Sequence, residues 1–325
     1  MKLPRRQFLR LAASAAALPA VPRIARAETY PARPIRIIVP YAPGGSADIF
    51  ARLIGQWLSE RLGQSFIIEN RPGAGGNIGT EAVVRAIPDG YTLLHVTSVN
   101  AWNTTLYDNL NFNFISDIAP IASIVRGVGV MEVTPTFPAK TVPEFIAYSK
   151  ANPGKVNMAS GGVGSPLHLY GELFKMMTGV DVLHVPYRGT APALTGLFAD
   201  QVQVMFDTLS TSIENIRAGK LRALAVTSAT RSDVLPAIPA VGEFVPGYEA
   251  TGWHGIGAPK NTPVEVVEKL NKEINAALAD PSVKARLANL GYTAFSSSPA
   301  DFRKLIAEET GKWARVIRAA NIKPS

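Results

Sequence analysis

Serine and histidine are the side chains of this sequence that could do nucleophilic chemistry, because the chain contains no cysteine. Ser165 and His168 lie three residues apart and would share one face of a helix. A hydrolase built on this pair also needs an orienting carboxylate and an oxyanion hole, and the sequence has no G-x-S-x-G elbow. The favoured interpretation makes Ser165 a helix cap before Pro166, with His168 donating to a ligand.

Metal chemistry has little support in the sequence. The four histidines are scattered and form neither an H-x-x-x-H nor an H-E-x-x-H pair. Without cysteine there is no thiolate metal site, iron–sulfur cluster or disulfide. We therefore expect no metal and no cofactor.

Four glycine-rich loops point to ligand binding. Each loop follows a predicted strand and precedes a helical pattern, at residues 40–48, 70–80, 160–168 and 186–192. The first turn of a helix offers unpaired N–H donors, and glycine lets a ligand approach the main chain closely. Any one loop could be an ordinary tight turn, but the four together predict an anion site between two sheets.

Nucleotide binding is poorly supported by the same loops. The sequence contains no G-x-x-x-x-G-K-[ST] motif, and Ile78 stands where a dinucleotide fingerprint needs its third glycine.

The elements that must position these loops alternate between short apolar runs and helical stretches. This pattern predicts an α/β fold with largely parallel sheets. Strands are expected at residues 35–40, 66–69, 92–97, 128–133, 156–160, 182–185, 202–207 and 221–227. The length suits two domains, and glycine clusters suggest that the chain crosses between them near residues 127–132 and 249–255.

The net charge of +8 suggests nucleic-acid binding until its distribution is considered. Residues 1–27 begin with a basic segment, continue through a short Ala-rich run and end in Ala25-Arg26-Ala27. This is typical of an export signal, and the Arg5-Arg6 pair resembles a twin-arginine signal. Cleavage near Ala27 would remove six basic residues, leaving 33 − 6 = 27 against 25 acidic residues, or +2. We therefore expect an exported, periplasmic protein that does not bind nucleic acid.

An ordered set of motifs resembles the tripartite tricarboxylate transporter substrate-binding receptors, also called the Bug family. The matching stretches are IIVPYAPGGSAD (37–48), ENRPGAGGNIG (69–79), PDGYTLL (88–94), SGGVGSPLH (160–168), VPYRGTAP (185–192), FD (206–207) and GKLRALAVTS (219–228). Together they run through the chain in the family's order.

The resemblance implies a type II periplasmic-binding-protein architecture, in which two α/β domains joined by two crossing strands close on a ligand. Domain 1 would comprise residues 28–129 and 253–325, and domain 2 residues 130–252. Family ligands are usually carboxylates. The resemblance implies a ligand site at Tyr41, Pro43, Gly44, Gly45, Ser46, Asn77, Ser98, Asn100, Ser160, Gly164, Ser165, His168, Tyr187, Arg188, Gly189 and Asp207.

Several side chains have a structural alternative. An acid at Asp48 would stabilise a helix start and repel an anion, so a structural role is favoured. Arg188 could bind the ligand or form a salt bridge with Asp207. Tyr187 is expected to be pocket wall, and Trp102 to pack in the core.

The sequence therefore predicts a receptor that performs no catalysis. The protein is expected to be a monomer that presents a small carboxylate to membrane permease subunits. The alternatives are a secreted serine hydrolase using Ser165 and His168, and a receptor that feeds a membrane sensor.

Overall fold

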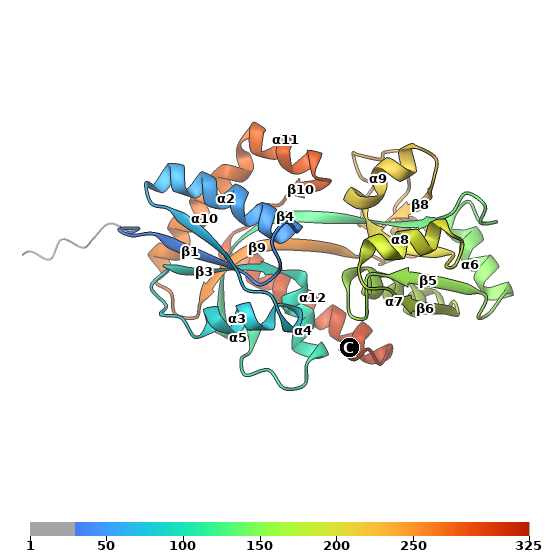
Figure 1. The fold of residues 1–325 in the computed structure, drawn as a ribbon, viewed down its shortest axis with the longest axis horizontal. Coiled ribbons are helices and arrows are strands. Elements are labelled where there is room, and N and C mark those ends of the chain that lie inside the picture. The colour runs from blue at the N-terminus through green and yellow to red at the C-terminus, as the bar shows by residue number, and fades with distance from the viewer. Residues whose placement is uncertain (1–29, 325) are drawn as a thin grey trace, which may run out of the picture.

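Residues 30–324 are described by the computed structural model; the predicted export signal lies outside them. Two lobes lie side by side along the longest axis of the molecule, and two long strands run from one to the other (Figure 1). Among the described residues, no helix has the length and apolar character needed to cross a membrane.

Lobe 1 is built around three parallel strands in the order β2-β1-β3, flanked by β9, part of β4 and the short β10. The strands are β1 (Ile35–Val39), β2 (Phe66–Asn70), β3 (Thr92–Thr97), β4 (Ile118–Val133), β9 (Thr251–Pro259) and β10 (Tyr292–Ala294). The helices are α2 (Ser46–Leu62), α3 (Asn77–Val84), α4 (Ser98–Leu106), α5 (Phe114–Asp117), α10 (Val264–Ala279) and α11 (Pro281–Asn289). A 3-10 turn, η1 (Ala74–Gly76), precedes α3.

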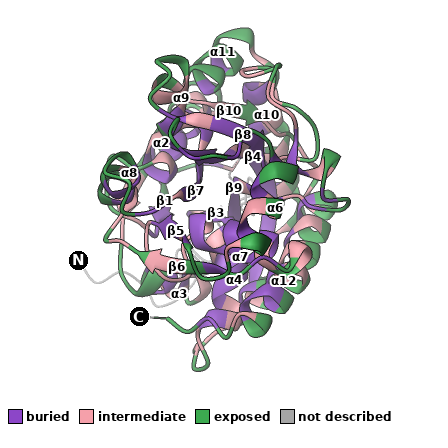
Figure 2. Cartoon of the chain, turned by 90° about the vertical axis from the view of Figure 1, so that its right-hand side faces the viewer, coloured by how far each residue is buried: buried purple, intermediate pink, exposed green. Residues whose placement is uncertain are grey.

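Lobe 2 repeats the strand–helix alternation around parallel pairs that β5 makes with β6 and β7. Its strands are β5 (Val156–Ser160), β6 (Val182–Pro186), β7 (Val204–Thr208) and β8 (Arg222–Val226). Its helices are α6 (Val142–Ala151), α7 (Pro166–Thr178), α8 (Thr190–Phe198), α9 (Leu209–Arg217) and the 3-10 turn η2 (Val241–Glu243). The strands are buried and the outer faces of the helices are exposed (Figure 2). Each lobe has a buried cluster of its own, and a larger cluster continues from one lobe to the other.

Strands β4 and β9 connect the lobes. They pair antiparallel from Ile118 opposite Pro259 to Val128 opposite Thr251, and β4 then continues into lobe 2, where it pairs with β7 and β8. All pairs made by these two strands are antiparallel. The prediction of largely parallel sheets therefore holds for β1 with β2 and β3 and for β5 with β6 and β7, and is wrong wherever β4 or β9 pairs.

Helix α12 (Pro299–Ala319) spans the junction on one face. Trp313 packs its ring 5.3 Å from that of Trp102 on α4 and 5.8 Å from that of Tyr170 on α7. Trp102 is fully buried, which confirms its predicted place in the core. One aromatic side chain therefore touches both lobes, and a relative motion of the lobes must slide or separate these rings.

The eight predicted strands are present, but the sequence pattern missed much of the junction. Strand β4 begins ten residues before the predicted start at 128, and β10 was not predicted. Strand β9 contains Gly252, Gly255 and Gly257, which are residues that disfavour strands. At Gly255 a Cβ atom would overlap the Phe302 ring and lie 2.6 Å from the Ala122 carbonyl oxygen, so glycine permits α12 to pack close to this strand.

A pair of glycine substitutions tests this account of the junction. Gly255→Ala should lower the free energy of unfolding by about 1–3 kcal/mol, because the added methyl group overpacks a closed contact. Gly311→Ala is the matched control: Gly311 lies in α12, and no atom lies within 4 Å of the place that an added methyl group would take. Alanine there should raise stability by about 0.5–1 kcal/mol. Urea unfolding of both variants measures the difference, and equal effects would contradict the packing argument.

Candidate functional site

A cavity of about 240 Å³ lies at the junction, walled by both lobes and floored by the crossing strands. Lobe 1 contributes the starts of α2 and α4 together with Tyr41 and Tyr292, and lobe 2 contributes Pro166, Tyr170 and Thr208. The floor comprises Gly127, Val128, Gly129, Gly252 and His254. Four of the predicted site residues line this cavity: Tyr41, Gly45, Ser46 and Ser98.

The start of α2 supplies main-chain donors to the cavity. Its N-cap is Gly45, and no side chain caps this helix end. The first N–H groups of a helix have no partner within the helix, so those at Ser46 and Ala47 are available at a lining segment. Ser98 and Val99 bring the start of α4 to the same cavity. Two helix starts give the site a positive potential without a cationic side chain.

Asp48 fixes the loop that presents these donors. Its carboxylate accepts hydrogen bonds from the Gly44 amide (3.0 Å), from Asn70 Nδ2 (3.1 Å) and from two guanidinium nitrogens of Arg52 (2.9 and 3.0 Å). The Arg52 hydrogen bond is the main reason that the pKa of Asp48 falls to about 2. Asp48 therefore holds the loop in shape, as its favoured structural role required.

Tyr41 and Asn100 form hydrogen bonds that fix the segment around Thr97 beside the cavity. The Tyr41 hydroxyl lies 2.8 Å from Thr97 Oγ1, and burial raises the pKa of Tyr41 to about 12. The Asn100 side chain accepts from the Thr97 amide (2.8 Å) and donates to Thr80 Oγ1 (2.9 Å). Asn100 does not line the cavity: it caps α4 from inside the lobe.

His254 is a cavity residue that the sequence pattern did not single out. Its Nδ1 lies 3.0 Å from Nε2 of His95, and both rings are buried. Burial lowers the pKa of His254 to about 3 and holds that of His95 well below its usual value, so both rings are neutral. Within residues 30–324, His254 Nε2 makes no hydrogen bond. The two histidines stand 159 residues apart in the chain, so no spacing motif could reveal them.

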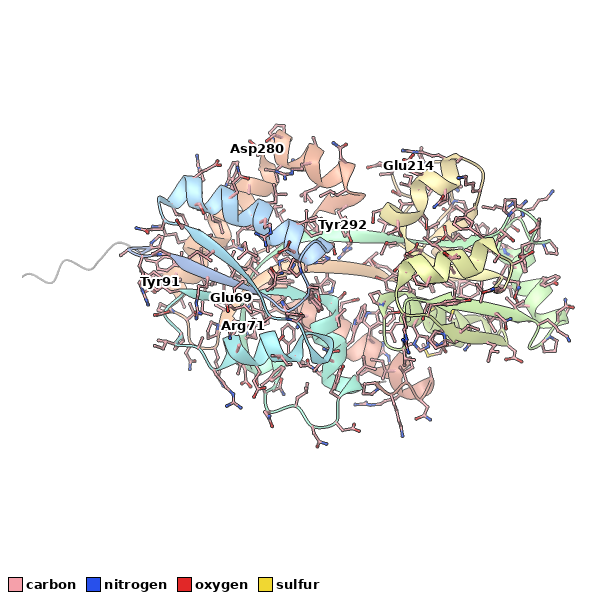
Figure 3. All side chains as sticks on the ribbon, in the orientation of Figure 1. Glu69, Arg71, Tyr91, Glu214, Asp280 and Tyr292 are labelled. Carbon is pink, nitrogen blue, oxygen red and sulfur yellow. The ribbon has the colours of Figure 1, made fainter. Side chains whose placement is uncertain are left out.

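Tyr292 is the second such residue and comes from β10. Its ring covers Gly127, where a Cβ atom would lie 2.6 Å away from it. Burial raises the pKa of Tyr292, and the nearby side chains of Ser46 and Ser210 partly offset this shift. Tyr292 lies at the junction of the lobes, and Glu214 lies on α9 in lobe 2 (Figure 3). A three-residue strand carries too short a pattern to predict this position.

The loop before α7 has the predicted cap. Ser165 Oγ accepts from the His168 amide at 3.3 Å, and the helix begins with Pro166. The His168 ring does not face that hydroxyl: its Nδ1 accepts from the Gly164 amide (3.1 Å), and its Nε2 lies 3.5 Å from Glu172. Both ring nitrogens already have partners, which favours a structural role over that of a base for Ser165.

A second cavity, of about 250 Å³, contains more of the predicted loop residues. It is lined by Tyr41, Gly164 and Ser165, and by the glycine loop 161–163 facing α4. Ser160 lies behind it, 2.6 Å from Nε2 of His184, and the His184 and His168 rings stack at 3.6 Å.

The remaining predicted residues line none of the cavities described here. Gly44 and Pro43 are exposed on the first loop, Asn77 is buried under it, and Gly189 caps α8. The hydroxyl of Tyr187 packs against Gly196 on α8, and Arg188 is exposed.

Asp207 is fully buried and accepts from Thr208, Thr211 and Ser212. Ser212 Oγ also lies 2.8 Å from Glu132 Oε1, so its one hydroxyl group bridges these two acids. Burial raises the pKa of both carboxyls. With its partners supplied inside lobe 2, Asp207 takes no part in the salt bridge considered for exposed Arg188.

Comparison with known proteins gives one consistent result. Residues 50–322 match the family described as the tripartite tricarboxylate transporter family receptor. The chain is similar to Protein BugT of Bordetella pertussis, with 37% identity over 300 residues, 91% of this chain and 92% of BugT.

Solved structures agree with that match. An R. palustris protein solved with adipate has a TM-score of 0.78 and 36% identity, over 91% of this chain and 100% of that one. The periplasmic binding protein BugD has a TM-score of 0.74 and 35% identity over the same shares. These likenesses confirm the predicted architecture.

Buried His254 and half-buried His184 predict an acid-sensitive fold. Burial lowers the pKa of His184 to about 4 and that of His254 to about 3. As pH falls from about 6.5, the unfolded chain binds protons that the folded chain does not. The free energy of unfolding should therefore fall between pH 7 and 5, by at most about 1.4 kcal/mol per pH unit for each histidine.

A variant isolates this contribution. In His184→Gln the amide can keep the hydrogen bond to Ser160 but cannot titrate. The raised pKa values of Glu132 and Asp207 act in the opposite direction and are the same in both proteins. Urea unfolding at pH 7, 6 and 5 should show a shallower acid dependence for the variant, and parallel curves would contradict the assignment.

Proposed function

Because this chain belongs to the tripartite tricarboxylate transporter receptor family, we propose that it is a periplasmic receptor that captures a small carboxylate between its lobes and presents it to membrane permease subunits. The export signal would be removed near Ala27, outside the described residues. The protein would act as a monomer. The resemblance to a twin-arginine signal concerns only the export route.

One observation carries the proposal: two helix starts deliver main-chain N–H groups to a cavity that both lobes enclose. A carboxylate accepts several such hydrogen bonds, and its charge is stabilised by the positive ends of α2 and α4. Asp48, which would repel an anion, is neutralised by Arg52 and turned away into the loop.

His254 adds a directed donor. If Nε2 of His95 carries its proton and donates to Nδ1 of His254, then the proton of His254 is on Nε2, the nitrogen left for a ligand. The opposite arrangement would leave a buried N–H donor on His95 Nδ1, an atom without a partner among the described residues. Because an orphaned buried donor is rare, the first arrangement is favoured.

The lobes correspond to two moving bodies in this proposal. The division at residues 129/130 and 252/253 falls on β4 and β9, the strands that cross the junction. Small changes of backbone angle there would open the cavity by hinge motion. A membrane sensor could read the same closed form as a permease does, so it is the alternative partner.

A catalytic role for Ser165 has less support. A serine nucleophile needs a base within hydrogen-bond reach, and the ring nitrogens of His168 are directed to Gly164 and Glu172. The capping bond between Ser165 and the His168 amide explains their spacing without chemistry.

Thermal unfolding with a panel of carboxylates tests the proposal. A ligand at 100 times its Kd should raise the free energy of unfolding by about 2.7 kcal/mol and raise Tm accordingly. Gly45→Val should abolish the shift, because the side chain would project beside the α2 donors. The Tm of the unliganded variant should be almost unchanged, since the nearest atom to a Cβ at Gly45 is 3.9 Å away. A Tm that responds to no carboxylate would refute the receptor proposal.

His254→Asn tests the donor. Asparagine can place an amide near the position of Nδ1 and keep the contact with His95, but it lacks a group at Nε2. Affinity for the bound carboxylate should fall about 10- to 100-fold, the value of a hydrogen bond to a charged group. Isothermal titration measures the change. Unaltered affinity would remove His254 from the ligand's contacts, and circular dichroism checks that the fold is kept.

A further inference from the structure

The junction cavity is proposed to bind an anion, yet no charged side chain lines it among the described residues. Among its lining residues, all of which lie in the described part of the chain, there is no lysine, arginine, aspartate or glutamate. Its histidine, His254, is neutral, and its phenols are protonated at neutral pH. The positive potential in the cavity therefore comes from helix starts and not from side-chain cations.

The main-chain donors of the helix starts also lie on one side of the cavity, and His254 adds a ring nitrogen on the floor. Lobe 1 supplies the start of α2 at Ser46 and the start of α4 at Ser98. The floor and the opposite wall are largely apolar, formed by Val128, Pro166 and the ring of Tyr170. An ionised carboxylate buried against this wall would lose its hydration and meet only neutral hydroxyl groups, those of Tyr170 and Thr208, with no cation to offset its charge, which is unfavourable.

The neighbouring space offers no cation to a second carboxylate either. A larger cavity, of about 730 Å³, shares Ser46, Thr208 and Tyr292 with the junction cavity. Its lining contains Arg217, but that guanidinium lies 3.0 Å from Glu214 on the same helix. The pair is neutral as a whole, so a ligand reaching into this space meets a dipole and no net positive charge.

We infer that the receptor selects carboxylic acids with one carboxylate and an apolar, preferably aromatic, body, and discriminates against dicarboxylates. This inference rests on the proposed function. The carboxylate accepts from the starts of α2 and α4, and the body packs against Val128, Pro166 and the tyrosine rings. Aromatic rings meet favourably edge to face or offset, which suits a ligand ring among Tyr41, Tyr170 and Tyr292.

Isothermal titration of residues 28–325 with benzoate, hexanoate, adipate and succinate tests this inference, with benzamide as the uncharged control. Benzoate and hexanoate should bind at least about tenfold more tightly than either dicarboxylate, and benzamide should not bind. If a dicarboxylate binds as tightly as benzoate, the selectivity is wrong while the receptor proposal stands. If neither these probes nor a wider carboxylate panel bind, both fail. Binding of benzamide equal to that of benzoate would also refute both.

A charge substitution gives an independent readout. Val128→Lys places an ammonium group in the wall of the cavity and should raise the ratio of adipate to benzoate affinity at least about tenfold. Val264→Lys is the matched control, because it adds the same net charge outside the cavity. Val264 is 66% exposed at the start of α10. A ratio that is the same in both variants overturns the inference. If Val128→Lys does not fold, Val99→Lys carries the same test from the start of α4.

Discussion

The antiparallel pairing of β4 with β9 is the constraint on which the rest of this structure depends. These strands are the backbone connection between the lobes, and the residues at the lobe 2 end of their pairing are also the floor of the cavity. At Gly129 a Cβ atom would come within 2.6 Å of Thr227 Oγ1, and at Gly252 it would point at the Tyr170 hydroxyl, 3.3 Å away. Side chains at these positions would fill the cavity or push the lobes apart. The glycines of these paired strands thus leave room for the cavity and also allow the two lobes to lie close together.

Buried polar groups surround this floor on both sides. His95 and His254 meet below it in lobe 1, and Glu132, Asp207 and Ser212 meet in lobe 2. Burial drives each group toward its neutral form, with the pKa of the histidines lowered and that of the acids raised. The hydrogen bonds within each cluster restrict the positions of its side chains, while His95 Nδ1 and Glu132 Oε2 have no partner among the described residues. The clusters hold side chains beside the cavity without adding net charge to the proposed anion site.

The sequence allowed the βα loops to be predicted because their signals are local. Glycines, caps and apolar runs stand within a few residues of one another, as at Ser165 before Pro166, and the helix starts followed directly. The crossing strands were harder, because β9 is rich in glycine and its strand conformation is imposed by its neighbours. His254 and Tyr292 reach the cavity only through long-range pairing. Asn100 was predicted to contact the ligand but caps α4 instead. An asparagine just after a strand can take either role, and only the folded structure distinguishes the two.

In the proposed receptor, the different contributions of the two lobes would let a neutral pocket both hold and release an anion. Lobe 1 supplies the helix-start donors, whereas lobe 2 supplies Pro166, Tyr170 and Thr208, which cover the cavity from the other side. Hydrogen bonds and helix dipoles act more strongly when water is removed, so the donors of lobe 1 hold a carboxylate tightly only while lobe 2 covers it. Opening the lobes admits water and weakens those interactions without breaking a salt bridge, because no cationic side chain lies among the described lining residues. Affinity is then set largely by the position of the lobes, which is the property that a partner binding both lobes can control.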